Sequence, residues 1–281
     1  MSELQARVLQ EMRLRGMSPR TVESYIHAMR ELARFYWAPL DTLSCEQVQQ
    51  FLDEIITLRE LSWSTVNVYF SAYRFLYVQV LKRSEQKFSI PPRGRSGKRP
   101  GVLSPSDARK LIDAPHSLKH RALLSLAYGS GLRVSELVRV QIKDVDRGRM
   151  MLRVDQGKGR KDRYTVLSRH SLQLLGEYYR AFHCPQPYFF PGRVHGKPIS
   201  TATALAVYNE AIRRSGVRRV GGIHVLRHCF ATHLMEAGVD IYTIKRFMGH
   251  TSVVTTGRYM HVSAEHLAKV RSPIDTLYDV A

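Results

Sequence analysis

This chain of 281 residues contains, in sequence order, an arginine, a histidine with a second arginine, a second histidine and a tyrosine, residue types that could cleave a phosphodiester. Arg133 stands upstream, His224 and Arg227 are three residues apart, and His250 and Tyr259 follow. Two guanidiniums can hold the non-bridging oxygens of a phosphodiester in a two-pronged geometry that lysine cannot match. An imidazole can help to remove the proton of a tyrosine hydroxyl, which then acts as a nucleophile. These residue types therefore predict metal-free cleavage of a phosphodiester through a covalent phosphotyrosine.

The charge of the chain agrees with a polyanionic partner. Lys and Arg number 43 against 24 for Asp and Glu, a formal net charge of +19. Such an excess on a foldable chain points most often to nucleic acid. A solvated basic surface, or association with ribosomes, would give the same composition. The hydrophobic fraction of 44% argues against disorder, and the length favours two domains.

The cysteines and the apolar stretches bear on the compartment. Cys45, Cys184 and Cys229 are odd in number and widely spaced, which fits reduced thiols better than a disulfide framework. No stretch is as apolar as a signal peptide or as long as a membrane span. We expect a cytoplasmic protein with no membrane partner.

Residues 1–83 are predicted to form a small helical domain. Ser18-Pro19 is typical of an N-cap followed by proline at the first helical position. Ser44 to Gln47 fits a capping box, and a third apolar stripe begins at Ser64. With a helix before Gly16 this predicts four helices. Their apolar stripes are expected to form the core, and the exposed Arg and Lys are candidates for DNA contacts.

Residues 84–101 have the composition of a linker. They are rich in proline and glycine, and they carry basic residues with Glu85 as the only acidic one. A basic strap of this kind could lie along a phosphate backbone, although a solvated linker has the same composition. The candidate DNA-binding residues in it are Arg93, Arg95, Lys98 and Arg99.

Residues 102–281 are predicted to form an α+β domain. Ser104-Pro105 begins a helix, and short strands at 150–154 and 163–166 flank a turn at 156–159. Further helices are expected at 200–214, 224–236 and 240–247, the last closed by Gly249. The predicted fold is mostly α with a small antiparallel β-sheet.

Four motifs in order make the chain resemble the tyrosine recombinases of the phage integrase family, in the style of the short bacterial Xer-type enzymes. They are the segment 131–137 (GLRVSEL), the segment 157–161 (GKGRK), the segment 224–233 (HVLRHCFATH) and the run from Met248-Gly249-His250 to Tyr259. The resemblance covers nearly the whole chain. It implies a helical SAM-like core-binding domain at 1–83 and a catalytic domain at 102–281.

The resemblance also implies a role for each matching residue. Arg133 and Arg227 would hold the phosphate, and His224 would act as acid or base for Tyr259. His250 would donate a hydrogen bond to a phosphate oxygen. Tyr259 would form a 3′-phosphotyrosyl link.

Three further residues come from the same motifs. Lys158 would protonate the leaving 5′ oxygen, and Lys161 is its rival. Glu136 would brace the site by holding an arginine or buried amides, whereas the alternative is an ordinary surface glutamate. Arg160 and Lys161 are also candidates for DNA contacts.

Several nearby residues have plainer interpretations. Tyr242 is expected to pack within its helix, and Tyr278 lies off the motif. His224 and His228 stand four residues apart, as in some zinc sites, but no third ligand follows at a sensible spacing. His228 and His233 are expected to be structural or secondary phosphate contacts, and no metal or other cofactor is expected.

The reaction that the resemblance implies is strand exchange on double-stranded DNA. A homo-tetramer, or an assembly with a related recombinase, would act on two DNA sites and pass through a Holliday junction without metal or ATP. The tail after Tyr259 would pack on a neighbouring protomer or on its own domain. The sequence leaves no room for the extra helix of integron integrases or for an arm-binding domain. A type IB topoisomerase and a DNA-binding protein without catalysis are the alternative functions. The target site and the biological role, on a chromosome or a mobile genetic element, stay open.

Overall fold

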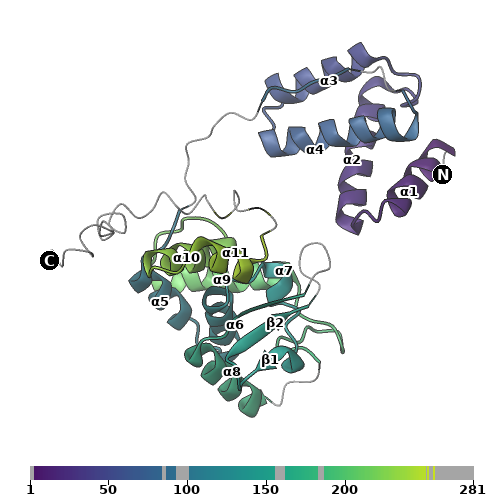
Figure 1. Cartoon of the computed structure of the whole chain (residues 1–281). Coiled ribbons are helices and arrows are strands. Elements are labelled where there is room, and N and C mark those ends of the chain that lie inside the picture. Colours follow the sequence, from purple (N-terminus) through teal and green to yellow (C-terminus); the bar gives the residue numbers. More distant parts are fainter. Residues whose placement is uncertain are drawn as a thin grey trace, which may run out of the picture. The chain divides into compact units, whose positions relative to one another are not determined.

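The protein is described from a computed structural model, which covers residues 3–83, 87–92, 101–155, 162–182, 187–250, 252 and 256. The chain divides into two compact units, residues 1–97 and 98–281 (Figure 1). Each unit has its own hydrophobic core. Helices dominate both units, and the strands among the described residues form one small antiparallel sheet in the second. The predicted fold class is therefore confirmed.

Serine caps begin the helices of the first unit. Ser18 accepts a hydrogen bond from the Thr21 amide, and Ser44 and Gln47 form both bonds of the capping box. The apolar stripe predicted from Ser64 lies on the fourth helix, which Ser62 caps, and on its extension. The elements are α1 (Glu3–Leu14), α2 (Pro19–Tyr36), α3 (Cys45–Thr57), α4 (Trp63–Arg74) and a π-helical extension at Phe75–Val80.

The core of the first unit is apolar and includes buried tyrosines. Phe51, Leu52 and Ile55 on one face of α3 are fully buried. Tyr73 on α4 is buried as well, and its hydroxyl donates to the Ala28 carbonyl on α2 at 3.0 Å. Burying aromatic area while keeping the hydroxyl bonded stabilises the packing of α2 against α4.

The second unit is built around a central helix. Helix α6 (Leu118–Gly129) is buried from Ala122 to Ala127 and packs against α8 (Arg169–Phe182) and α10 (His224–Glu236). The other helices are α5 (Pro105–Asp113), α7 (Val134–Leu137), α9 (Thr201–Ser215) and α11 (Ile241–Met248).

The sheet of the second unit has the order β1-β2-β3, with both pairs antiparallel. Strand β2 (Met151–Val154) and β3 (Arg163–Val166) match the predicted pair, but Met150 has a φ of 54° and lies outside the strand. Strand β1 (Val145–Asp146) was not expected, since two residues carry too little periodicity to detect. Helix α11 packs against β3. The sheet thereby reaches the region where the motif residues gather.

A histidine on α10 forms hydrogen bonds to the first residues of the second unit and to helix α6. His233 on α10 lies 2.9 Å from the Tyr128 hydroxyl and 3.0 Å from the Leu103 carbonyl. A carbonyl can only accept, so Nε2 carries the proton and Nδ1 accepts from the tyrosine. The Leu103 amide donates in turn to the thiol of buried Cys229. These contacts give His233 a structural role. Within the described parts of the chain, no helix has the length and apolar character to cross a membrane.

Candidate active site

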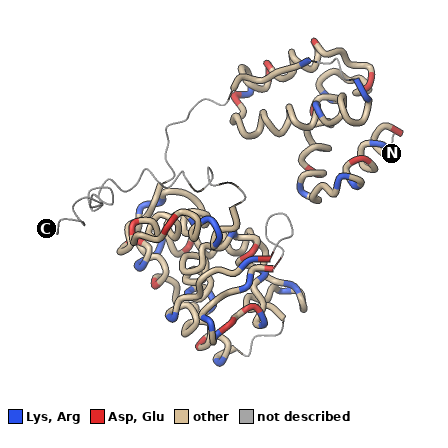
Figure 2. Tube along the Cα trace, in the orientation of Figure 1, with Lys and Arg blue, Asp and Glu red and all other residues tan. Residues whose placement is uncertain are grey.

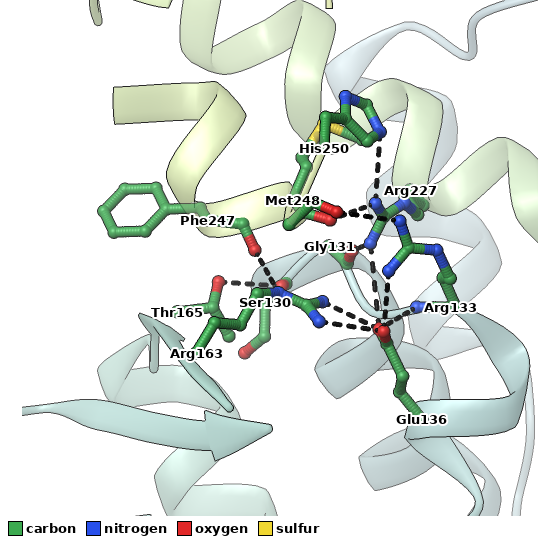
Figure 3. Close-up of polar contacts among 11 residues, drawn as sticks. Ser130, Gly131, Arg133, Glu136, Arg163, Thr165, Arg227, Phe247, Met248 and His250 are labelled. Atoms are coloured by element: carbon green, nitrogen blue, oxygen red, sulfur yellow. Dashed lines mark hydrogen bonds and ion pairs between the residues drawn. The ribbon is translucent and has the colours of Figure 1, made fainter. Parts of the chain in front are cut away.

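The end of α11 is where the catalytic motifs meet. Asp240 caps the start of this helix, and Gly249, with a φ of 58°, ends it. The last carbonyls of an α-helix have no partner within the helix. Here three successive carbonyls each accept from a different arginine: Arg163 donates to Phe247, Arg227 to Met248 and Arg133 to Gly249 (Figure 3). The helix terminus therefore fixes three guanidiniums in one place.

Glu136 binds the same three arginines from the opposite side. Arg163 donates to both of its carboxylate oxygens, at 2.8 and 2.7 Å, and Arg133 donates through its side chain at 2.8 Å and its amide at 2.9 Å. Arg227 approaches to 3.8 Å. Burial alone would raise the pKa of Glu136, but the bonds from Arg163 and Arg133 outweigh it and lower the pKa to about 2. The carboxylate is thus ionised at neutral pH.

A glycine allows Arg227 to reach the site. The Arg227 side chain is buried and also donates to the Gly131 carbonyl. Gly131 has a φ of 59°, and a Cβ there would lie 2.3 Å from the Phe230 ring. Only glycine accepts that backbone conformation in so little space. In the Gly-Leu-Arg motif, the Gly131 carbonyl therefore accepts from Arg227, and the Arg133 side chain enters the site.

The two motif histidines are held neutral. Burial, followed by the charges of Arg227 and Arg133, lowers the pKa of His224, and the same causes with Arg163 added lower that of His250 to about 4. His250 Nε2 lies 3.3 Å from the Arg227 guanidinium, which can only donate. Nδ1 therefore carries the proton and donates to the buried Thr256 hydroxyl at 2.9 Å.

The charges in this cluster do not balance. Three guanidiniums and one carboxylate leave an excess of two positive charges, and the nearby imidazoles are neutral. A buried excess of this size is stabilised by an anion with several acceptor oxygens. Arg133 is the most exposed of the three arginines, with 22% of its side chain accessible against 10% for Arg163 and 6% for Arg227. The arrangement can therefore bind and polarise a phosphate group.

The structure places five of the predicted site residues in one cluster, namely Arg133, Glu136, His224, Arg227 and His250. The alternative of a surface position for Glu136 is wrong, since 7% of its side chain is exposed. The other predicted residues lie outside the described part of the chain: Lys158, Arg160, Lys161 and Tyr259, with the linker residues Arg93, Arg95, Lys98 and Arg99. Among the described residues, no group of three or more His, Cys, Asp or Glu could hold a metal ion.

Two features of the site differ from the sequence interpretation. Tyr242 does not pack into its helix but is 68% exposed. Helix α11 buries Ile244 and Met248, four residues apart, and Tyr242 lies on another face. Arg163 was assigned only to a strand. The available signal was strand parity, because it shares a face with Thr165 and Leu167, both buried.

Among the described residues, Lys and Arg are distributed along both units, with Asp and Glu among them (Figure 2). The cluster around Glu136 is distinguished from the other described basic residues by its burial. What marks the site is the concentration of arginines around a single carboxylate.

Comparison with known proteins identifies the class of this site. The model of the phage integrase family matches residues 102–266, and that of the phage integrase N-terminal SAM-like domain matches residues 4–86. The tyrosine recombinase XerC of Xanthomonas campestris pv. campestris is 33% identical over 91% of this chain and 83% of its own length.

Solved structures share the fold. XerH site-specific recombinase bound to its difH substrate aligns with a TM-score of 0.71 at 21% identity, over 90% of this chain and 79% of its own. A lambda integrase tetramer bound to a Holliday junction aligns with a TM-score of 0.71 at 18% identity, over 91% of this chain and 76% of its own. The chain belongs to the phage integrase family and is a tyrosine site-specific recombinase of the Xer-like type.

Proposed function

We propose that the recombinase cuts DNA by attack of the Tyr259 hydroxyl on a scissile phosphate. The new bond joins the tyrosine oxygen to phosphorus at the 3′ end, and the bond to the 5′ oxygen breaks. The tyrosine proton is taken up by a base, and the 5′ oxygen gains a proton from an acid. A 5′ hydroxyl from another strand then reverses the step. Because the phosphotyrosyl bond conserves the energy, neither metal nor ATP is needed.

The buried excess of positive charge is the observation that carries this proposal. The pentavalent transition state of the attack carries more negative charge than the bound diester. Groups already fixed toward that charge stabilise the transition state without reorganising. Arg133 and Arg227 are fixed in this way by α11 and Glu136. They are the groups that would hold the two non-bridging oxygens.

The histidines supply proton transfer. With its pKa lowered, His224 is neutral near pH 7 and can accept the proton of Tyr259. His250 Nε2 accepts from Arg227 in the free protein. To donate to a phosphate oxygen, His250 must gain a proton at Nε2, and the negative phosphate favours that change by raising its pKa. Lys158 is proposed to protonate the 5′ oxygen.

Strand exchange needs more than one protomer. We propose that the substrate is double-stranded DNA and that four copies, or copies with a related recombinase, act on two sites through a Holliday junction in the cytoplasm. The lambda integrase tetramer bound to a Holliday junction supports this, since it shares the fold of this chain. The basic linker residues and Arg160 and Lys161 are proposed to contact the DNA backbone.

The test is the capture of a covalent protein–DNA adduct. Full-length protein is mixed with sheared duplex DNA of the source genome, quenched in detergent, and the adduct is mapped on both protein and DNA. We expect wild type to form an adduct at Tyr259, and Tyr259→Phe to form none while binding the recovered DNA equally well. Tyr242→Phe is the matched control, because that tyrosine is exposed and also lies in the C-terminal part of the chain. A normal adduct yield from Tyr259→Phe would overturn the proposal.

A further inference from the structure

Arg163 stands out because its guanidinium is turned entirely toward protein groups. Its Nε donates to the Phe247 carbonyl at 2.8 Å, and its two terminal nitrogens donate to the two oxygens of Glu136. Only 10% of the side chain is exposed. A bidentate bond with a carboxylate is the strongest geometry available to arginine. Nε and both terminal nitrogens of Arg163 therefore donate to other residues of the protein, which indicates a structural role.

Both partners of Arg163 adjoin residues that are proposed to bind the phosphate. Glu136 also accepts from the side chain and the amide of Arg133. Phe247 belongs to the end of α11, which leads through Gly249 to His250. Figure 3 shows Arg163 between the Phe247 carbonyl and Glu136, with Arg133 and Arg227 on the far side of that carboxylate. One side chain thus links β3, α7 and α11.

We propose that Arg163 is a positioning residue for recombination. It fixes Glu136, and through it Arg133, and it holds the end of α11 that carries His250, without touching the phosphate itself. The inference rests on the proposed function, because the groups that Arg163 positions are those proposed to bind the scissile phosphate.

Charge gives a second reason for this role. Arg163 donates to both oxygens of Glu136, and one carboxylate shared by three guanidiniums leaves two positive charges for the substrate. Without Arg163, Glu136 would be a buried carboxylate with only those two arginines to neutralise it. It would draw them toward itself and away from the phosphate. The loss is expected in the rate of cleavage more than in the affinity for DNA.

The hairpin of β2 and β3 enters the same linkage. Arg163 pairs with Val154 at the last described rung of this hairpin. Lys158 lies between these two residues in the sequence. Arg163 therefore connects the described end of this hairpin to the arginine cluster.

The backbone at Gly249 is adapted to Arg163. A Cβ on Gly249 would lie 2.8 Å from Cδ of Arg163 and 3.0 Å from its Nε. The motif glycine thus leaves space for this arginine as well as for the turn that follows α11. The lack of a side chain at Gly249, which ends α11, therefore makes room for Arg163 beside the arginine cluster.

The first test separates binding from chemistry. Arg163→Met, Arg163→Lys and wild type are compared on the duplex recovered by adduct mapping, measuring the dissociation constant and the single-turnover rate of adduct formation. We expect Arg163→Met to lower the rate about 100-fold, the cost of a displacement of about 1 Å in a catalytic group, with affinity within about threefold. Arg163→Lys should recover part of the rate, because an ammonium keeps the charge but not the fork.

The matched control is Arg153→Met on the neighbouring strand. Arg153 also pairs with a carboxylate, Asp162 at 2.8 Å, but 41% of its side chain is exposed. We expect both its rate and its affinity to equal those of wild type. If Arg163→Met loses affinity in proportion to rate, Arg163 is a DNA contact and the inference fails.

A second test needs no DNA. Hydrogen exchange is followed at the amides of Gly249 and His250, which bond to the carbonyls of Arg246 and Lys245. We expect faster exchange there in Arg163→Met, with Arg163→Lys used if the first variant does not fold. Unchanged exchange in folded Arg163→Met, or in Arg163→Lys where Arg163→Met does not fold, overturns the positioning role. If exchange changes as expected but wild type forms no adduct, the proposed function fails while the linkage through Arg163 stands.

Discussion

The two units of this protein use arginine and glutamate in different ways. In the first unit, Arg59 lies between two glutamates, 3.0 Å from Glu54 and 3.5 Å from Glu31, and 39% of its side chain is exposed. In the second, Glu136 lies among three arginines and is 7% exposed. Glu31 also binds Arg34 at 3.3 Å, so two arginines balance two glutamates in this network near the surface. The network around Glu136 has surplus positive charge in the interior.

This difference separates a surface network from a functional one. Water and salt screen the exposed network, so it adds little to stability, and the apolar core of the first unit holds that fold. The buried network cannot be screened. Its surplus is offset by the carbonyls that end α11, and a bound phosphate would complete the balance. The second unit thus holds charges whose full compensation is expected only with substrate.

Removing Arg227 should have the largest effect on stability. In Arg227→Met the Met248 and Gly131 carbonyls lose their buried donor. We expect a loss of about 3 to 5 kcal/mol in the free energy of unfolding of the second unit, measured by urea denaturation. The counterpart in the first unit, Arg59→Met, should cost less than about 1 kcal/mol, and less still in high salt. Equal losses in the two variants would remove the distinction between the networks.

Replacing Gly249 should have a smaller effect. Gly249→Ala forces a left-handed conformation on alanine and brings its Cβ within 2.8 Å of Arg163. We expect a loss of about 2 kcal/mol in the free energy of unfolding, of which about 1 kcal/mol comes from the conformation alone.

The matched control for that substitution is Gly216→Ala. Gly216 ends α9 with a φ of 67°, and nothing lies within 4 Å of the added Cβ. It should cost about 1 kcal/mol. The excess at Gly249 then measures the crowding of Arg163. If the two alanine variants are equally destabilised, the Arg163 side chain moves away from the new Cβ at no cost, and it is less tightly packed against Gly249 than the structure indicates.

Local signals in the sequence were sufficient for much of the fold. Ser44 with Gln47, Ser104 with Pro105, and the Gly249 terminus each predict a helix boundary from neighbours a few residues apart, and the structure has them. Those boundaries depend on hydrogen bonds within one helical turn, which the sequence spells out directly.

The interactions around Arg163 could not be predicted in this way. Arg163 bonds to Glu136 across 27 positions and to Phe247 across 84. One partner is a backbone carbonyl, and since every residue has one, the residue type at Phe247 does not indicate this bond. The motif residues Arg133, Arg227 and His250 were found because their pattern is recognisable. The arginine that orients them belongs to no pattern that periodicity detects.

The pH dependence of stability tests the buried network directly, and its effect is the smallest. The pKa of Glu136 is lowered to about 2 in the folded protein, from 4.5. Its stabilising contribution is therefore complete above pH 4.5 and is lost as the pH falls from 4.5 toward 2. Wild type should exceed Glu136→Gln in free energy of unfolding at pH 5, and this difference should shrink by about 1 kcal/mol at pH 3.5. Glu136 also raises the pKa of His224, so a second comparison in the His224→Gln background removes that contribution. A difference that stays constant over this range would mean that Glu136 is not held ionised by Arg163 and Arg133, and that the buried network resembles the exposed one.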